Sequence, residues 1–224
     1  MDCVIVLAKA PRPGEVKTRL ATEPTIGPEG AARLAEAFLR DTLAACAAVR
    51  GAETVVCFAP NSSEREFRAL APRVRLVAQV EGDLGARLAA AFADAFERGA
   101  ARAVAVGTDA PHVGAERLER ALAMLAEADV VLGPAEDGGY DLIALRRRAP
   151  GLFHGIAWST TAVFEQTLAR ARVQGLSVAT LESTFDVDRL EDLERLRQLT
   201  VSGETHCPHT ERVLADLARD GRAR

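Results

Sequence analysis

The chain has 224 residues, of which 48% are hydrophobic, and its formal net charge at pH 7 is −4. This length allows one large domain or two small ones, with enough apolar side chains for a sizeable core. A pI of about 5.7 argues against a generic nucleic-acid-binding protein. No apolar run approaches the length of a membrane span, and the scattered cysteines and the absence of a signal-peptide pattern predict a cytoplasmic protein with reduced thiols.

Strand and helix signals alternate along the chain. Short apolar runs predict strands at residues 3–7, 54–58, 74–77, 102–107, 130–132, 138–145 and 177–181. Amphipathic spacing and capping residues predict helices at 28–49, 84–98, 114–128, 159–174, 190–199 and 210–219, with a short helix opened by the capping box Ser63-x-x-Glu66. This alternation predicts an α/β fold with a largely parallel central sheet.

Residues 103–113, AVAVGTDAPHV, are the centre of the predicted architecture. The apolar strand runs into Thr108 and Asp109, and Pro111 ends its pairing because proline cannot donate a ladder hydrogen bond. Asp109 therefore lies at the carboxyl end of a central strand, where open α/β sheets bind ligands. A carboxylate there suits a divalent cation. The alternative is that Asp109 only turns the chain before the next helix.

The loop after the first strand is rich in cations. Lys9, Arg12, Lys17 and Arg19 lie within a stretch whose prolines keep it out of a helix until about residue 26. Arginine provides forked contacts and lysine a point charge, so the loop is suited to a polyphosphate. It lacks the Walker pattern. A solvated basic loop is the alternative.

Two further loops are rich in glycine. In residues 79–88, Gly82 and Gly85 allow backbone to approach a flat ligand, and Asp83 can cap the helix that follows. In residues 133–145, Asp137 precedes a pair of glycines and an aromatic ring, although a simple β-turn would also explain those glycines. Trp158 is predicted either to line an acceptor site or to belong to the core.

Residues 185–196, FDVDRLEDLERL, contain alternating acids. Asp188 either caps the next helix or joins Asp109 as a second metal carboxylate. His206, Cys207 and His209 are close in sequence, but ligands packed so closely rarely complete a tetrahedral zinc site, so a polar tail is favoured. For His112, ordinary hydrogen bonding at a helix entry is favoured over substrate contact.

The chain resembles nucleotide-diphospho-sugar transferases of the GT-A type, above all the arsenosugar-biosynthesis or radical-SAM-associated glycosyltransferase family. The motifs that carry the resemblance are KAPRPGEVKTRL, GDLGARL, GTDAPHV, DGGYDLIAL, the Trp158-Ser159-Thr160 segment and FDVDRLEDL. The first motif is also similar to that of 2-phospholactate guanylyltransferases. The resemblance implies a Rossmann-like GT-A fold over residues 1–200, with 201–224 as a C-terminal helical tail of the same domain. It also implies that Asp109 and Asp188 hold Mg²⁺ or Mn²⁺.

We expect a metal-dependent transferase that takes a nucleotide or nucleotide-sugar donor and a small-molecule acceptor, without a nucleic-acid or membrane partner. The predicted catalytic residues are Asp109 and Asp137. The predicted nucleotide-binding residues are Lys9, Arg12, Lys17, Arg19, Gly82, Asp83, Gly85 and Thr108. The predicted acceptor-side residues are Gly138, Gly139, Tyr140, Trp158 and Ser159.

The resemblance favours glycosyl transfer from a nucleotide-diphospho-sugar. The alternative is nucleotidyl transfer from a nucleoside triphosphate to a phosphorylated small molecule, which the cation-dense first loop favours. A non-catalytic nucleotide sensor is a third hypothesis. The oligomeric state is open, with a homodimer as one option.

Overall fold

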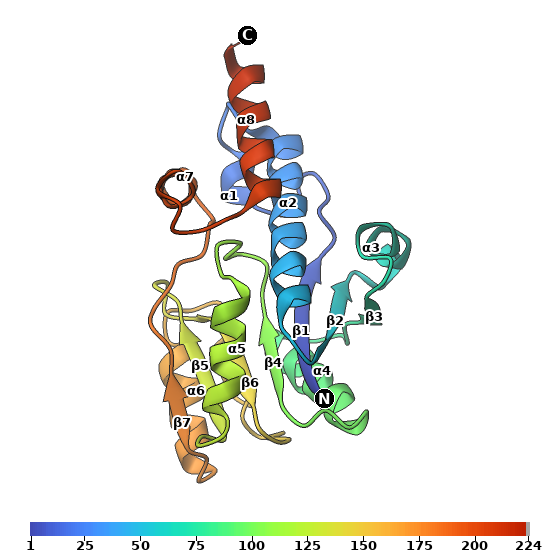
Figure 1. Cartoon of the computed structure of the whole chain (residues 1–224), viewed down its shortest axis with the longest axis vertical. Coiled ribbons are helices and arrows are strands. Elements are labelled where there is room, and N and C mark those ends of the chain that lie inside the picture. The colour runs from blue at the N-terminus through green and yellow to red at the C-terminus, as the bar shows by residue number, and fades with distance from the viewer. Residues whose placement is uncertain (223–224) are drawn as a thin grey trace.

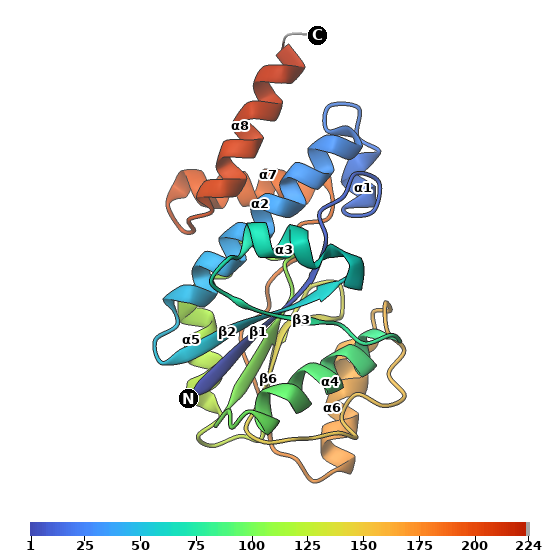
Figure 2. The same cartoon turned by 90° about the vertical axis from the view of Figure 1, so that its right-hand side faces the viewer.

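A computed structural model describes residues 1–222 as one sheet with helices on both faces (Figures 1 and 2). The strands are β1 (Asp2–Lys9), β2 (Ala52–Ala59), β3 (Arg75–Ala78), β4 (Ala103–Val106), β5 (Val130–Pro134), β6 (Tyr140–Leu145) and β7 (Val178–Thr180). The helices are α1 (Thr18–Ala21), α2 (Gly27–Ala48), the 3₁₀ turn η1 (Asn61–Ser63), α3 (Glu64–Leu70), α4 (Leu84–Glu97), α5 (Ala115–Met124), α6 (Val163–Val173), α7 (Leu190–Ser202) and α8 (Pro208–Arg222).

The strand order across the sheet is β3-β2-β1-β4-β6-β5-β7. Strand β6 runs antiparallel to both β4 and β5, and the other pairs are parallel. The predicted mixed α/β fold with a mostly parallel sheet is therefore confirmed. Because β1 has β2 on one side and β4 on the other, the chain order reverses there, and the carboxyl ends of β1 and β4 flank a crevice where such sheets bind ligands.

Strand β1 is buried on both faces and shows why the sheet needs two helical layers. Val4 and Val6 point into one apolar cluster, which α2, α3 and α5 complete. Cys3 and Ile5, which alternate with them, point into the other cluster with side chains of α4 and α6. Figure 2 shows α2 and α5 on one side of the sheet and α4 and α6 on the other.

A third apolar cluster lies beyond the edge of the sheet and joins α1, α2 and α7. It contains Phe38 of α2 together with Phe185 and Val187 from the segment before α7. Cys207 is also fully buried there, and its thiol donates to the carbonyl of Pro111 at 3.3 Å. The stretch predicted as a polar tail thus contains a core residue, and α8 packs along α2 (Figure 1).

Several local predictions were wrong in detail. The predicted basic loop contains the short helix α1. Helix α6 begins at Val163 instead of residue 159, because Ser159 has a left-handed backbone with φ 63°. The hydroxyl of Ser63 donates to the carbonyl of Pro60, so it does not cap α3. The predicted cap of α4 is confirmed, in contrast, because the carboxylate of Asp83 accepts from the amide of Ala86 at 2.8 Å.

All four cysteines are buried and free of disulfides. Among residues 1–222, no helix is both long enough and apolar enough to cross a membrane.

Candidate functional site

A cleft of about 1230 Å³ opens at the carboxyl ends of β1, β2 and β4. Its lining includes the apolar residues Leu7, Leu88 and Ile143. Its two walls come from different parts of the chain. The first, here called the charged wall, consists of Lys17, Arg19, Asp109 and Asp188. The second, the packed wall, consists of Arg87 and Trp158, with Gly85 packed behind the indole.

Most of the predicted site residues meet in this cleft. Those that line it are Lys9, Lys17, Arg19, Thr108, Asp109, Asp137, Gly139, Tyr140, Trp158, Ser159 and Asp188. Those outside its lining are Arg12, Gly82, Asp83, Gly85 and Gly138. Arg12 instead pairs with Glu66 across the protein surface, and that pairing raises the pKa of the Arg12 guanidinium.

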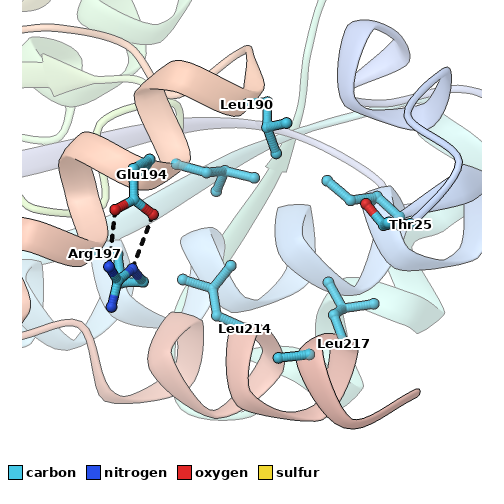
Figure 3. A pocket seen from close by; sticks show the side chains of 9 residues that line it. Thr25, Leu190, Glu194, Arg197, Leu214 and Leu217 are labelled. Carbon is cyan, nitrogen blue, oxygen red and sulfur yellow. Dashed lines mark hydrogen bonds and ion pairs between the residues drawn. The ribbon is translucent and has the colours of Figure 1, made fainter. Parts of the chain in front are cut away.

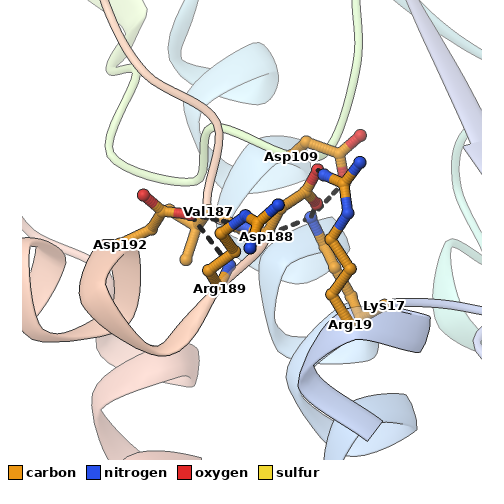
Figure 4. A network of polar contacts seen from close by, with 7 residues as sticks. All are labelled: Lys17, Arg19, Asp109, Val187, Asp188, Arg189 and Asp192. Carbon is orange, nitrogen blue, oxygen red and sulfur yellow. Dashed lines mark hydrogen bonds and ion pairs between the residues drawn. The ribbon is translucent and has the colours of Figure 1, made fainter. Parts of the chain in front are cut away.

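Lys17 lies at the centre of the charged wall, with only 5% of its side chain exposed. Its ammonium donates to the carbonyl of Val187 at 2.8 Å and to the Asp188 carboxylate at 2.9 Å, and it pairs with Asp109 (Figure 4). These partners match the three donors of an ammonium group. Burial lowers the pKa of Lys17, but the nearby carboxylates outweigh burial, so the net pKa is raised.

The backbone brings the two carboxylates of the charged wall together. The amide of Val187 donates to the carbonyl of Asp109 at 2.7 Å, which fixes residues 185–188 beside the end of β4. Phe185 and Val187 are buried, so the alternating residues Asp186 and Asp188 point away from that core. The carboxylates of Asp109 and Asp188 stay accessible from the cleft, because 54% of the Asp109 side chain and 39% of the Asp188 side chain are exposed.

Asp188 is not the cap of α7. The carboxylate of Asp192 accepts from the amides of Asp188 and Arg189, at 3.0 and 2.8 Å, and so satisfies the start of that helix. The Asp188 carboxylate is therefore left for the cations, and Arg19 donates to its second oxygen at 3.3 Å.

Asp186 is a cleft residue that sequence reasoning left out of the predicted site. Burial first, and then the negative charges of Asp109 and Asp137, raise its pKa to about 7. The alternation of Phe185, Asp186, Val187 and Asp188 was the available signal, because a strand-like segment places every second residue on one face.

The packed wall depends on a missing side chain. A Cβ on Gly85 would lie 2.7 Å from the carbonyl oxygen of Phe153 and 2.8 Å from Nε1 of Trp158, so only glycine lets the indole pack against the start of α4. Trp158 also meets Tyr140 edge to face, with ring centroids 6.5 Å apart. It thus serves both the core and the cleft.

Arg87 is the second residue that sequence reasoning missed. It follows Leu84 by three residues, so the same face of α4 presents both to the cleft. Its Nε, like Nε1 of Trp158, finds no hydrogen-bond partner among the described residues. Buried donors are normally paired, so these two nitrogens are exceptions, and both belong to side chains that line the cleft.

The other predicted loop residues have structural partners. Lys9 donates to the carbonyl of Glu15 at 2.7 Å. The Asp137 carboxylate accepts from the amide of Gly139 at 2.8 Å and so shapes the turn before β6. Gly138, at φ 89°, lies so close to the backbone of Thr161 that a Cβ would clash. Gly82 has φ 120°, a conformation that favours glycine.

Within residues 1–222, no group of three histidine, cysteine or acidic residues is arranged to hold a metal ion. The charged wall nevertheless passes a test of fit. Asp109 and Asp188 already share one cation, the Lys17 ammonium, and their oxygens are the hard donors that Mg²⁺ and Mn²⁺ prefer.

A second hollow, of about 360 Å³, lies between α7, α8 and the turn before α2 (Figure 3). Its lining is mainly apolar, and its two charged residues, Glu194 and Arg197, pair with each other at 2.8 Å. It therefore lacks the free charges that a nucleotide requires, and the cleft at the sheet edge is the better candidate.

A mixed sheet whose ligand cleft lies at the ends of β1 and β4 is the architecture of nucleotidyl and glycosyl transferases, and the relatives of this chain support a transferase. Residues 42–160 match the DUF2064 family, described as uncharacterized proteins conserved in bacteria, and the chain belongs to that family.

Three similar proteins illustrate the relationship. A 2-phospho-L-lactate guanylyltransferase of Methanothermobacter thermautotrophicus is 30% identical over 79% of this chain and 76% of its own length. A crystal structure from Desulfovibrio desulfuricans, named provisionally as a nucleotide-diphospho-sugar transferase, is 34% identical, with a TM-score of 0.87 over 99% of both chains. Rv0371c of Mycobacterium tuberculosis, solved with manganese, shares the fold at 19% identity and a TM-score of 0.51 over 88% of this chain and 99% of its own.

Proposed function

We propose that the protein is a metal-assisted nucleotidyltransferase that joins a nucleoside triphosphate to a phosphorylated small molecule. The observation that carries the proposal is the charged wall, where Asp109 and Asp188 converge on one cation beside the cations of the β1 loop. A relative with a named reaction, at 30% identity over most of the chain, is a guanylyltransferase. We therefore favour nucleotidyl transfer over glycosyl transfer, although the family resemblance of the sequence favours glycosyl transfer.

In this proposal an oxygen of the acceptor's phosphate attacks the α-phosphorus of the donor. The bond from the α-phosphorus to the bridging oxygen breaks, and pyrophosphate leaves. Lys9 and Arg19, which line the cleft beside β1, would bind the phosphates that leave. Trp158 and Ser159 would line the acceptor side.

Asp109 and Asp188 would hold the divalent ion. Such an ion supplies positive charge that neutralises the phosphates and favours their displacement. Arg19, 62% exposed at the mouth of the cleft, can follow the phosphates without leaving a buried charge unpaired.

Glycosyl transfer is the second candidate. It is favoured by the provisional name of the Desulfovibrio desulfuricans protein, which matches nearly the whole chain. The same wall could hold a nucleotide-diphospho-sugar, and a nucleoside diphosphate would then be the leaving group.

Competition binding separates the two reactions. Guanosine, GDP and GTP are titrated against the protein in saturating Mn²⁺, and the other three bases are compared in the same way. Nucleotidyl transfer predicts that the triphosphate binds about tenfold or more tightly than the diphosphate, or about 1.4 kcal/mol. Release of pyrophosphate when 2-phospho-L-lactate is added would support the proposal further. A preference for the diphosphate would make glycosyl transfer the better conclusion.

A further inference from the structure

The unexplained feature of the charged wall is that Lys17 occupies the position that a metal ion would need. Its ammonium has a partner for each donor, and the two carboxylates contribute their oxygens to it from two different segments of the chain (Figure 4). The Lys17 side chain is enclosed by its surroundings, since only 5% of it is exposed. Its ammonium lies 5.2 Å from the centre of the Phe38 ring.

The backbone of Lys17 also holds this position at a cost. Its φ and ψ are 45° and 46°, a left-handed conformation that residues other than glycine adopt infrequently. The residue precedes α1 and makes no side-chain cap for that helix. The conformation therefore serves the placement of the ammonium between Asp109 and Asp188.

We propose that the Lys17 ammonium and a divalent ion compete for the same pair of carboxylates, so that the ion binds tightly only when nucleotide phosphates give Lys17 another partner. This inference rests on the proposed function, because the phosphates come from the donor. Without a nucleotide, Lys17 neutralises the two acids and weakens binding of free metal. With a nucleotide, Lys17 turns to the phosphates and the ion takes its place.

The consequence is coupling between the two ligands. The nucleotide strengthens metal binding, and by linkage the metal strengthens nucleotide binding by the same factor. Lys17 is thus a positioning residue that makes metal and nucleotide enter together.

The test is a titration of Mn²⁺ alone into the 224-residue protein. The free ion is measured at each step by its electron paramagnetic resonance signal. Lys17→Met removes the charge but retains most of the stem that packs near Phe38. We expect Lys17→Met to bind Mn²⁺ at least tenfold more tightly than the unaltered protein. Arg19→Met is the matched control, because Arg19 also pairs with Asp188 but is exposed and does not contact Asp109. It should change Mn²⁺ affinity less than threefold.

The second measurement repeats the titration with a saturating non-hydrolysable GTP analogue, corrected for the manganese that the analogue itself binds. The analogue should tighten Mn²⁺ binding at least tenfold in the unaltered protein and less than threefold in Lys17→Met. If Lys17→Met does not fold, Lys17→Gln keeps a donor for the Val187 carbonyl without the charge.

The proposal is overturned if Lys17→Met binds free Mn²⁺ no more tightly than Arg19→Met. It is also overturned if the nucleotide tightens metal binding equally with and without Lys17. Failure of the proposed function gives a different result, in which no nucleotide binds or reacts while free Mn²⁺ still binds more tightly to Lys17→Met.

Discussion

On the charged wall of the cleft, acids and cations neutralise one another, whereas the packed wall contains two buried nitrogens without protein partners. Lys17 links Asp109 to Asp188, and every donor of its ammonium is used. Across the cleft, Nε of Arg87 and Nε1 of Trp158 have no acceptor among the described residues. A ligand must therefore rearrange existing ion pairs on the charged wall, whereas on the packed wall it meets side chains whose unpaired nitrogens are buried.

The two walls should therefore contribute to ligand affinity in different ways, one through charge and the other through shape. On the charged wall, a ligand gains only the difference between its own contacts and the ion pairs that it replaces. On the packed wall, geometry is held by close packing around Gly85, so substitutions should act through shape. Charge changes and size changes should therefore affect the two walls differently.

The largest effect is expected from Asp109→Asn, which removes charge from the charged wall while keeping its size. We expect metal-dependent nucleotide binding to weaken by about 100-fold or more, or about 2.7 kcal/mol. Lys17 retains Asp188 and the carbonyl of Val187, so the fold should persist. Calorimetry with a nucleotide and Mn²⁺ measures the affinity, and a melting curve checks folding.

Asp83→Asn is the matched control for that change. It removes the same charge, and asparagine caps helices as well as aspartate does, so α4 should remain capped. Asp83 lies outside the lining of the cleft. An equal loss of affinity in both variants would mean that binding responds to net charge, and would refute the role of Asp109.

The strands and the position of Asp109 were predictable because their signals are local. Apolar runs mark the strands, and Pro111 marks the end of pairing after β4. The partners of Lys17 were not predictable, because Asp188 is 171 positions away and reaches it only through the bond between Val187 and Asp109. The spacing that identified both acids says nothing about a lysine between them.

Glycines show the same limit. Sequence reasoning assigned Gly85 to contact with a ligand, whereas the structure shows it beneath Trp158. The residues that define its role lie in another loop, so no local pattern could identify it. Arg87 was missed for a related reason, since an arginine on an amphipathic helix is usually solvated.

A change of size should act on the packed wall. Gly85→Ala forces a methyl group against the Phe153 carbonyl and the Trp158 ring, so we expect a loss of about 1–3 kcal/mol in the free energy of unfolding. Trp158 is the single tryptophan, so its fluorescence should report the displacement directly. A denaturation curve measures the stability.

Gly107→Ala provides the control, because a Cβ there meets nothing within 4 Å and its backbone is not left-handed. If both variants have the same stability and the same emission maximum as the original protein, the tight contact at Gly85 is refuted.

A smaller effect is expected from Arg19→Ala, because Arg19 is exposed and its bond to Asp188 is long. Binding of GTP should weaken by about tenfold, or about 1.4 kcal/mol, while binding of guanosine should hardly change. Arg12→Ala is the matched control from the same loop, since Arg12 pairs with Glu66 outside the cleft. Equal losses for GTP and guanosine in Arg19→Ala would mean that the loop shapes the cleft without holding phosphates.

The smallest effect concerns the support behind the charged wall. His112 stacks on Phe185, with ring centroids 4.3 Å apart, and its Nε2 lies 2.9 Å from the hydroxyl of Thr184. Burial first, and then the positive charges of Arg195 and Arg117, lower the pKa of His112 from 6.5 to about 4. The neutral ring thus helps to hold the segment that carries Asp186 and Asp188.

Stability should consequently depend on pH through His112. The unfolded chain takes up a proton near pH 6.5, whereas the folded protein resists protonation until about pH 4, so the contribution is complete above pH 6.5 and is lost as the pH falls toward 4. Between pH 7 and about pH 5.5 the loss should be about 1 kcal/mol in the free energy of unfolding. His112→Gln should remove this part of the pH dependence, and His154→Gln, which alters an exposed histidine, should retain it. Parallel pH profiles for the His112→Gln variant and the unaltered protein would show that the ring is protonated normally in the folded state, and that the charged wall has no pH-sensitive support.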